Sequence, residues 1–304
     1  MEEILNMMKD LQKKLPLVEF LCSEPLSSHT FIKTGGNSDI FAIPCTIEEL
    51  QAIVQYADQH GTPLTILGRG TNVIIRDTGI RGIVISLEKF NKISISDEEI
   101  YCGSGASIID VSRAALDSQL SGLEFACGIP GTVGGALIMN AGAYGGEISE
   151  VLIQSTVVTP SGEILTLGQD QFDFAYRNSV FAKNKYIIVD ATFKLKMGNP
   201  TAIKAKMDEN TFLRESKQPL EYPSCGSVFK RPPNHYAGKL IQDSGLQGTR
   251  IGGAEVSTKH AGFIVNVDHA TSTDYIKLIQ HVQKTVKDKF GVDLETEVKI
   301  IGDE

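Results

Sequence analysis

Tryptophan is absent from this chain of 304 residues, which also lacks long apolar runs, C-x-x-C cysteine pairs and an excess of basic residues. No run approaches the ~18 apolar residues of a membrane helix, so membrane insertion is not expected. The formal net charge is −8 at pH 7. This charge disfavours a nucleic-acid partner, because phosphate backbones are bound by clustered Lys and Arg. It leaves room for a local basic pocket that binds an anionic small molecule.

The cysteines are few, odd in number and scattered, which predicts neither a disulfide framework nor a metal site. They are Cys22, Cys45, Cys102, Cys127 and Cys225. Free thiols in a reducing compartment are the expectation. The N-terminal stretch, residues 1–15, is acidic and then amphipathic, without the basic and apolar regions of a signal peptide. The sequence therefore predicts a soluble cytoplasmic protein with no metal and no obligate protein partner.

Hydrophobic periodicity predicts an α+β chain in three parts, residues 1–80, 81–198 and 199–304. Thr46 and Glu49 form a capping-box pattern before an amphipathic helix that ends at Gly61. Further helices are expected over 2–15, 107–122, 200–217, 237–245 and 273–290, the last with a buried stripe of Ile276, Ile279, Val282, Val286 and Phe290. Hairpins are expected over 31–44 and 151–167, and strands over 64–67, 73–75, 186–197 and 292–302.

Residues 122–146 carry eight glycines and no Lys or Arg. Interior glycines disfavour a regular helix or strand, and the apolar residues among them disfavour a disordered linker. Thr132 can cap a short helix that begins near Val133, and Asn140 and Tyr144 are polar groups near its end. Backbone N–H groups at such a place suit a diphosphate or a flat ring system. A tight structural turn is the alternative.

A second glycine-containing turn, Gly68-Arg69-Gly70-Thr71-Asn72, joins the predicted strands 64–67 and 73–75. A Rossmann-type fingerprint is rejected, because Val73 occupies the third glycine position and no helical pattern follows. Two interpretations stay open: a glycine turn within a hairpin, or a nest of N–H groups with Thr71 and Asn72 as side-chain donors. Two glycine segments in one chain favour an extended cofactor with a central diphosphate.

These two segments together resemble the FAD-binding module of the p-cresol methylhydroxylase/vanillyl-alcohol oxidase type. More narrowly, the chain resembles the UDP-N-acetylenolpyruvoylglucosamine reductase family. The resemblance also covers residues 176–181, 226–232, 237–257 and 294–302, in that order. It implies two FAD-binding subdomains, 1–80 and 81–198, followed by a substrate-binding domain, 199–304. It also implies non-covalent FAD, because neither glycine segment has a His or Cys at a matching anchor, although Cys127 lies next to Gly128.

The resemblance implies that NADPH reduces the flavin, which then reduces UDP-N-acetylglucosamine enolpyruvate to UDP-N-acetylmuramate for peptidoglycan synthesis. Arg177 would hold the substrate carboxylate, Glu297 would polarise the enolpyruvyl group, and Ser227 would protonate the carbanion. Glu295 and Glu297 alternate on the predicted last strand and should share one face. No Ser-His-Asp arrangement accompanies Ser227, so a hydrolytic nucleophile is not expected.

The expected cofactor-binding residues form both glycine segments: Gly68, Arg69, Gly70, Thr71, Asn72, Gly128, Ile129, Pro130, Gly131, Thr132, Gly134, Gly135, Asn140, Gly142, Ala143 and Tyr144. The expected substrate-binding residues are Tyr176, Lys217, Lys230 and Arg231, with Arg250 as a further candidate for the diphosphate charge. Arg231 stands where some family members have asparagine. The chain is also short around 237–250, which matches the shorter subgroup without an extra substrate-covering loop.

Two alternatives share the glycine segments. One is another FAD-dependent oxidoreductase of the same superfamily, acting on a sugar or lactone. The other is a non-catalytic protein that binds a flavin or nucleotide without turning it over.

Overall fold

A computed structural model describes residues 2–303. The chain forms two compact units, each built from segments that are distant in sequence. Unit 1 comprises residues 1–22, 39–68 and 82–213, and unit 2 comprises 23–38, 69–81 and 214–304. The fold is α+β. The chain thus divides into two units of interleaved segments. The expected boundaries at residues 80 and 198 concern subdomains and stay a prediction.

The N-terminal part of unit 1 is a four-stranded sheet of order β1-β2-β5-β3, with β1 Glu19–Cys22, β2 Ser38–Ile43, β3 Leu64–Leu67 and β5 Ile80–Ser86. Helices α1 (Glu2–Lys14) and α2 (Ile47–His60) share one apolar core with this sheet. The capping box of α2 is confirmed: Thr46 Oγ1 accepts the Glu49 N–H at 3.2 Å. Gly61 ends the helix in the left-handed conformation, with φ 62°.

The expected hairpin over 31–44 is wrong. Strand β2 begins at Ser38 and pairs antiparallel with β1, so a long loop replaces the expected turn. Gly36 serves a close approach instead of a hairpin turn. Its N–H donates to Arg76 O at 3.0 Å, and a Cβ on it would lie 2.2 Å from Asp77 O. A glycine can mark a turn or a backbone contact, and only the contact needs partners from elsewhere in the chain.

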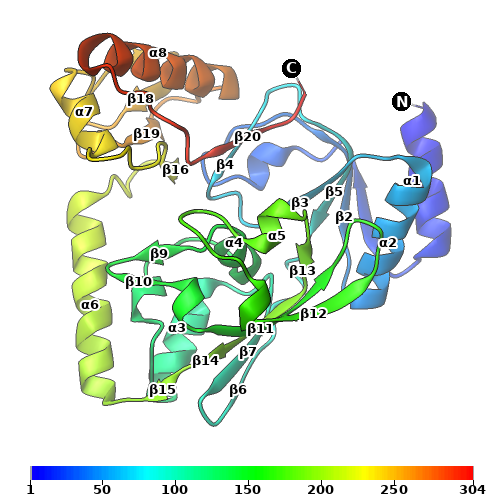
Figure 1. The fold of residues 1–304 in the computed structure, drawn as a ribbon. Coiled ribbons are helices and arrows are strands. Elements are labelled where there is room, and N and C mark those ends of the chain that lie inside the picture. Colours follow the sequence, from blue (N-terminus) through cyan, green and yellow to red (C-terminus); the bar gives the residue numbers. More distant parts are fainter. Residues whose placement is uncertain (1, 304) are drawn as a thin grey trace. The chain divides into compact units, whose positions relative to one another are not determined.

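The larger sheet of unit 1 has the order β12-β11-β14-β7-β6, with β13 also paired to β11 (Figure 1). Its strands are β6 Ile93–Ser96, β7 Glu99–Gly103, β11 Leu152–Val158, β12 Ile164–Gly168, β13 Ile187–Ile188 and β14 Asp190–Lys194. The hairpin expected over 151–167 is confirmed as β11 and β12. The strand expected over 186–197 is divided into β13, β14 and β15 (Lys196–Met197); the first two pair with β11, and β15 pairs with β8.

Helices α3 (Ile108–Asp117) and α4 (Val133–Ile138) pack against the larger sheet and share its core. Thr132 caps α4 as expected, since its Oγ1 accepts the Gly135 N–H at 3.2 Å. The remaining elements of unit 1 are short: β8 Leu120–Ser121, β9 Gly142–Ala143, β10 Gly146–Glu147 and α5 Val180–Lys183. Helix α6 (Pro200–Lys217) is capped by Asn199, as the sequence predicted, and belongs to unit 1 as far as Leu213.

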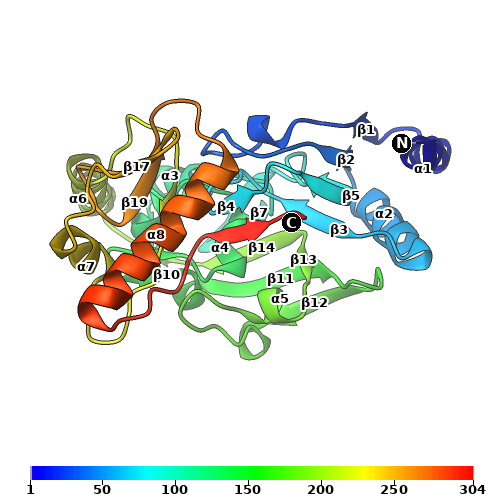
Figure 2. The ribbon, with the colours of Figure 1, turned by 90° about the horizontal axis from the view of Figure 1, so that it is seen from above.

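Unit 2 contains a sheet of order β16-β19-β18-β17 and a separate parallel pair, β20 and β4. Its elements are β4 Val73–Ile75, β16 Ser224–Ser227, α7 Ala237–Asp243, β17 Arg250–Ile251, β18 Ala254–Val256, β19 Phe263–Asn266, α8 Ser272–Phe290 and β20 Lys299–Ile301. Helices α7 and α8 share one core with this sheet. Figure 2 shows α8, in orange to red, continuing through an extended segment into β20.

Two expectations in unit 2 need correction. The predicted strand over 292–302 is regular only at Lys299–Ile301, where it pairs with β4, and residue 296 forms an isolated bridge. The predicted stripe of α8 is right for Ile279, Val282 and Val286, whereas Phe290 is 42% exposed. Tyr275 and Leu278 are buried in addition. The stripe is therefore shifted toward the N-terminal half of the helix.

Candidate functional site

The turn of residues 68–72 leaves β3 and enters β4, but these strands do not pair with each other. Strand β3 pairs with β5 and β4 pairs with β20, so the interpretation as a hairpin turn is wrong. Gly70 has φ +61°, and a Cβ on it would lie 2.4 Å from His29 O. Within residues 2–303, the backbone N–H groups of 68–72 donate no hydrogen bond. This turn therefore offers a row of free backbone donors.

Within unit 1, the second glycine segment contacts the first residue of this turn, Gly68. A Cβ on Gly68 would lie 2.9 Å from the Oγ1 of Thr132, so a side chain at residue 68 would force this contact to shift. The N–H groups of Gly131 and Thr132 also lack an acceptor among the described residues, although their neighbour Gly134 donates to Ser104 O at 2.8 Å. In each segment, taken by itself, the free amide donors suit the oxygens of a phosphate group.

Asn140, expected as a polar handle, is 2% exposed, and its side-chain amide bonds to residues just after the segment. Its Nδ2 donates to the Glu147 carboxylate at 3.0 Å, and its Oδ1 accepts the Ser149 N–H at 3.0 Å. These bonds support the backbone that follows α4. Tyr144 is 40% exposed and has φ 52°, a strained value for a tyrosine. Cofactor contacts of both side chains stay predictions.

Arg177 lies at the tip of a two-residue turn beside this glycine segment. Ala175 and Asn178 exchange two backbone hydrogen bonds of 3.0 Å, and Arg177 has φ +56°. Ser179 Oγ donates to Ile138 O at 2.9 Å, which anchors the turn to the end of α4. A left-handed non-glycine residue costs on the order of 1–3 kcal/mol and occurs often at functional sites. The structure thus brings Arg177 to the glycine segment within unit 1.

The guanidinium of Arg177 lies 5.0 Å from the ring centroid of Tyr176, which is itself 57% exposed. This cation–π contact favours one orientation of the flat guanidinium, whose N–H donors lie around the edge of its own plane. This orientation is compatible with bidentate binding of a carboxylate.

Ser227 is the last residue of β16 and follows a β-bulge. Ser224 pairs with Val265 and Ser227 with Phe263, so the ladder shifts by one residue between them. Gly226, which the sequence analysis did not single out, occupies the bulge with φ +75°. Its signal in the sequence is a lone glycine in a strand pattern. A bulge turns the next side chain away from its regular direction, and Ser227 is exposed here.

The thiol of Cys225, two residues before Ser227, is not a reactive nucleophile. The residue is 1% exposed, and burial raises its pKa to about 12. A thiol of this kind stays protonated at neutral pH.

Glu297 is brought next to the Ser227 segment inside unit 2. Its N–H donates to Val228 O at 2.8 Å, and its carbonyl accepts from Asn72 Nδ2 at 3.3 Å. The side-chain amide of Asn72, expected to face a phosphate, thus uses at least one donor within the protein. Residue 72 also accepts the Lys299 N–H at 3.0 Å. The last residue of the 68–72 turn is therefore tied to the segment that carries Glu297.

The expected common face of Glu295 and Glu297 is not formed by a regular strand. Glu295 is exposed and paired with Lys230, and the ammonium group lowers the pKa of this carboxyl. Glu297 is half-buried. The alternation argument requires an extended strand, whereas residues 293–298 are regular only at the bridge of 296. The two carboxylates therefore have different environments.

The candidate cations for a substrate diphosphate fall into two groups. Lys230 is paired with Glu295, and Arg250 is paired with Glu255. Arg231, in contrast, lies over the ring of Tyr236 at 4.1 Å, and Lys217 is exposed at the end of α6. Within the described residues, neither has a carboxylate partner.

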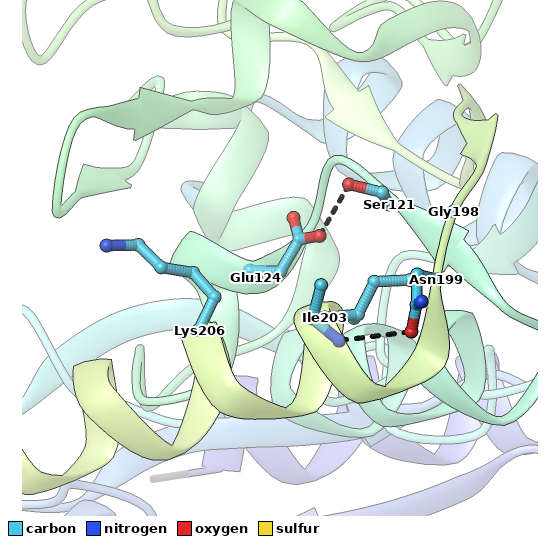
Figure 3. A pocket seen from close by; sticks show the side chains of 7 residues that line it. Ser121, Glu124, Gly198, Asn199, Ile203 and Lys206 are labelled. Carbon is cyan, nitrogen blue, oxygen red and sulfur yellow. Dashed lines mark hydrogen bonds between the residues drawn. The ribbon is translucent and has the colours of Figure 1, made fainter.

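Other features of the structure lie apart from these residues. A surface hollow of about 390 Å³ in unit 1 is lined by Ser121, Glu124, Gly198, Asn199, Ala202, Ile203 and Lys206 (Figure 3). None of the predicted site residues lines it. Cys127 contacts α6, with its Sγ 3.5 Å from Met207 O. Residues 2–303 contain no cluster of three His, Cys, Asp or Glu suited to a metal, and none of their helices is long and apolar enough to cross a membrane.

Comparison with known proteins decides the family. The chain is 60% identical over 297 residues to the UDP-N-acetylenolpyruvoylglucosamine reductase of Listeria innocua, covering 98% of this chain and all of the relative. The chain belongs to the UDP-N-acetylenolpyruvoylglucosamine reductase family. A homologue of the same name from Shouchella clausii is 57% identical over 304 residues, covering all of this chain and 98% of the homologue.

The domains of the reductase family match in the expected order. Residues 38–168 match an FAD-binding domain, and residues 218–301 match the C-terminal domain of UDP-N-acetylenolpyruvoylglucosamine reductase. The crystal structure of this reductase (MurB) from Thermus caldophilus superimposes with a TM-score of 0.81 at 31% identity, covering 94% of this chain and 99% of the other. Both glycine segments lie within the first match and Ser227 and Glu297 within the second, whereas Arg177 lies between them.

Proposed function

We propose that this chain reduces UDP-N-acetylglucosamine enolpyruvate to UDP-N-acetylmuramate with NADPH, a step of peptidoglycan precursor synthesis. The observation that carries the proposal is the presence, in one chain, of an FAD-binding domain and the C-terminal domain of the reductase family. The full-length likeness to curated reductases supports the same activity. It also disfavours both alternatives, an oxidoreductase for another substrate and a catalytically silent binding protein.

FAD is the cofactor that the two glycine segments fit. Bound FAD would supply the hydride-transfer chemistry between NADPH and the enolpyruvyl double bond. Each segment supplies candidate donors for a phosphate group: the free N–H groups of residues 68–72 in the first, and those of Gly131 and Thr132 in the second. Backbone donors are preorganised here, because Gly70 and Gly68 lie where no side chain could fit. Further contacts from Arg69, residues 128–135 and 140–144 complete the proposed binding set.

Arg177 binds the substrate carboxylate in this proposal. Its planar guanidinium can donate two parallel hydrogen bonds, and negative charge that develops beside the carboxylate is stabilised by this fixed cation. The support in the structure is the strained turn, anchored through Ser179 to α4, which holds residue 177 in one backbone conformation. Tyr176, whose ring lies against the guanidinium, contributes to substrate binding.

Ser227 donates the proton that completes the reduction. Its hydroxyl is exposed after the bulge at Gly226, whereas the thiol of Cys225, two residues earlier, is buried. Glu297 polarises the enolpyruvyl group, and the bond of its N–H to Val228 O fixes it relative to Ser227. The proton goes to the carbon that bears the ether oxygen, which yields the lactyl ether.

Arg231 and Lys217 balance the charge of the uridine diphosphate. Arg231 is oriented by the Tyr236 ring and, like Lys217, lacks a carboxylate partner in the described chain. Lys230 contributes only when it exchanges its ion pair with Glu295 for the substrate. We further propose that the enzyme works in the cytoplasm, an expectation that rests on the sequence.

The test is Ser227→Ala, studied separately in the two half-reactions. Flavin reduction by NADPH should keep its wild-type rate, because this step does not need the serine proton. Reoxidation by UDP-N-acetylglucosamine enolpyruvate should slow by about 10²-fold or more, the scale of a lost general acid. Stopped-flow flavin absorbance measures both rates. Reoxidation at the wild-type rate would contradict the role of Ser227.

A second assay separates the activity from its alternatives. Purified protein is incubated with NADPH and either the enolpyruvyl substrate or sugar and lactone substrates. NADPH consumption that depends on the enolpyruvyl compound supports the proposal. Turnover of a sugar or lactone alone, or flavin binding without turnover, would overturn it.

A further inference from the structure

His260 lies in the turn between β18 and β19 and makes two hydrogen bonds to the start of β19. Its ring Nδ1 accepts the N–H of Gly262 at 3.1 Å, and its main-chain carbonyl accepts the N–H of Phe263 at 3.0 Å. These two residues align Ser227. Phe263 is its partner in the ladder, and Gly262 O accepts the N–H of Val228 at 2.9 Å. His260 therefore holds both Phe263, which is the ladder partner of Ser227, and Gly262, which binds the neighbouring Val228.

The imidazole of His260 is itself held in place. A Cβ on Gly262 would lie 3.1 Å from the ring Cε1, so the ring packs closely against this glycine. Gly238 of α7 faces the ring, since a Cβ there would lie 3.6 Å from the same atom. The ring also packs edge-on against Phe263, with centroids 4.9 Å apart. This packing on several sides favours one orientation of the ring.

The ladder needs such support at this point. Gly226 lies in β16, and Gly262 directly precedes β19. Glycine has the widest conformational freedom of any residue, so neither backbone is restrained by a side chain of its own. The bulge at Gly226 removes one regular ladder position next to Ser227. Because the N–H of Gly262 can only donate, the Nδ1 of His260 is its unprotonated acceptor. Without this acceptor, the N–H of Gly262 would lose its hydrogen bond, and the carbonyl of Gly262, which binds the N–H of Val228, would be held less firmly.

We propose that His260 is a positioning residue for Ser227, acting through Gly262 and Phe263 to set the direction of the serine hydroxyl. The inference rests on the proposed function of Ser227 as proton donor. It assigns to His260 no contact with substrate or flavin. Its effect is confined to the half-reaction that needs the serine proton.

The experiment compares His260→Ala and His260→Asn with His281→Ala, which changes an exposed histidine of α8 in the same unit. An asparagine oxygen can accept the N–H two residues on, as in an Asx-turn, and replaces the lost acceptor. His260→Ala should slow flavin reoxidation about 10-fold, within the roughly 10²-fold that a displacement of about 1 Å can cost. His260→Asn should restore most of this rate. His281→Ala should match the wild type, and flavin reduction by NADPH should be unchanged in all three.

A double variant tests whether His260 acts through Ser227. In a Ser227→Ala background, His260→Ala should cause no further slowing, because the group that it positions is gone. Equal slowing in both backgrounds would overturn the inference, as would wild-type reoxidation in His260→Ala. Failure of His260→Asn to recover the rate would also overturn it. If Ser227→Ala alone reoxidised normally, the proposed function of Ser227 would fail instead, so the two failures are distinguishable.

Discussion

The two glycine segments and the strand pair around Ser227 serve chemistry in opposite ways. At Gly68 and Gly70 the functional groups are backbone N–H donors, and side chains are absent because a Cβ would collide with neighbouring atoms. Around Ser227 the functional groups are side chains, and the backbone hydrogen bonds of Val228 and Glu297 hold these side chains in position.

This difference determines which substitutions matter in each region. A bed of backbone donors tolerates the removal of side chains and is destroyed by the addition of one. A site built from side chains is inactivated when a side chain is truncated. A substitution in its backbone acts only by changing the backbone conformation. Substitutions that add a single methyl group to glycines of matched φ therefore distinguish the two regions.

The largest effect is expected for Gly70→Ala. The added Cβ would lie 2.4 Å from His29 O at φ +61°, so the turn must move and its N–H groups lose their arrangement. Purified protein should lose most of its bound flavin, and NADPH oxidation should fall in proportion. The measurement is flavin absorbance per protein after gel filtration.

The matched control for Gly70→Ala is Gly61→Ala. Gly61 has nearly the same conformation, with φ +62°, but no atom within 4 Å of the added Cβ. This variant should keep its flavin and lose only about 1 kcal/mol of unfolding free energy. Equal flavin loss in both variants would show that strain, and not the collision, removes the cofactor.

Gly226→Ala should have the next largest effect, and it should be kinetic. The added methyl meets no atom within 4 Å, so the only penalty is the left-handed φ of +75°. Relaxation of the bulge would turn Ser227 away, and reoxidation should slow about 10-fold with flavin content unchanged. Gly245→Ala is the control, because its φ is +76° and its surroundings are equally open. Slowing in both variants would remove the link to Ser227.

Thr46→Ala should affect stability alone. The hydroxyl of Thr46 caps α2, which carries none of the proposed site residues, and its loss should cost about 1 kcal/mol of unfolding free energy. Urea denaturation measures this change. Both half-reactions should keep their wild-type rates, and a change in either would connect α2 to the chemistry.

The smallest effect is a pH dependence of stability at His260. Burial lowers the pKa of this histidine, so the unfolded chain binds a proton more readily than the folded protein. Its contribution to stability is present above the unfolded pKa of about 6.5 and is lost as pH falls below that value. The unfolding free energy of the wild type should therefore decline more between neutral and mildly acidic pH than that of His260→Asn. Parallel pH profiles would contradict this assignment.

Local sequence signals predicted the helices well. The capping residues Thr46, Thr132 and Asn199 lie where the sequence placed them, because a cap depends on residues within one turn. Strand partners were predicted less well. The hairpin over 31–44 was wrong because β2 pairs with a strand from further upstream. The regular strand through Glu295 and Glu297 was wrong because the end of the chain pairs with β4 instead.

The sequence by itself determined the family, the expectation of FAD and the three residues proposed for the chemistry, since these depend on residue identities in ordered motifs. It could not determine that Gly68 meets Thr132, that Gly226 forms a bulge before Ser227, or that His260 holds the opposite strand. Each of these contacts joins segments that are separated along the chain. Their geometry follows from packing and from backbone hydrogen bonds that only the folded chain brings into range.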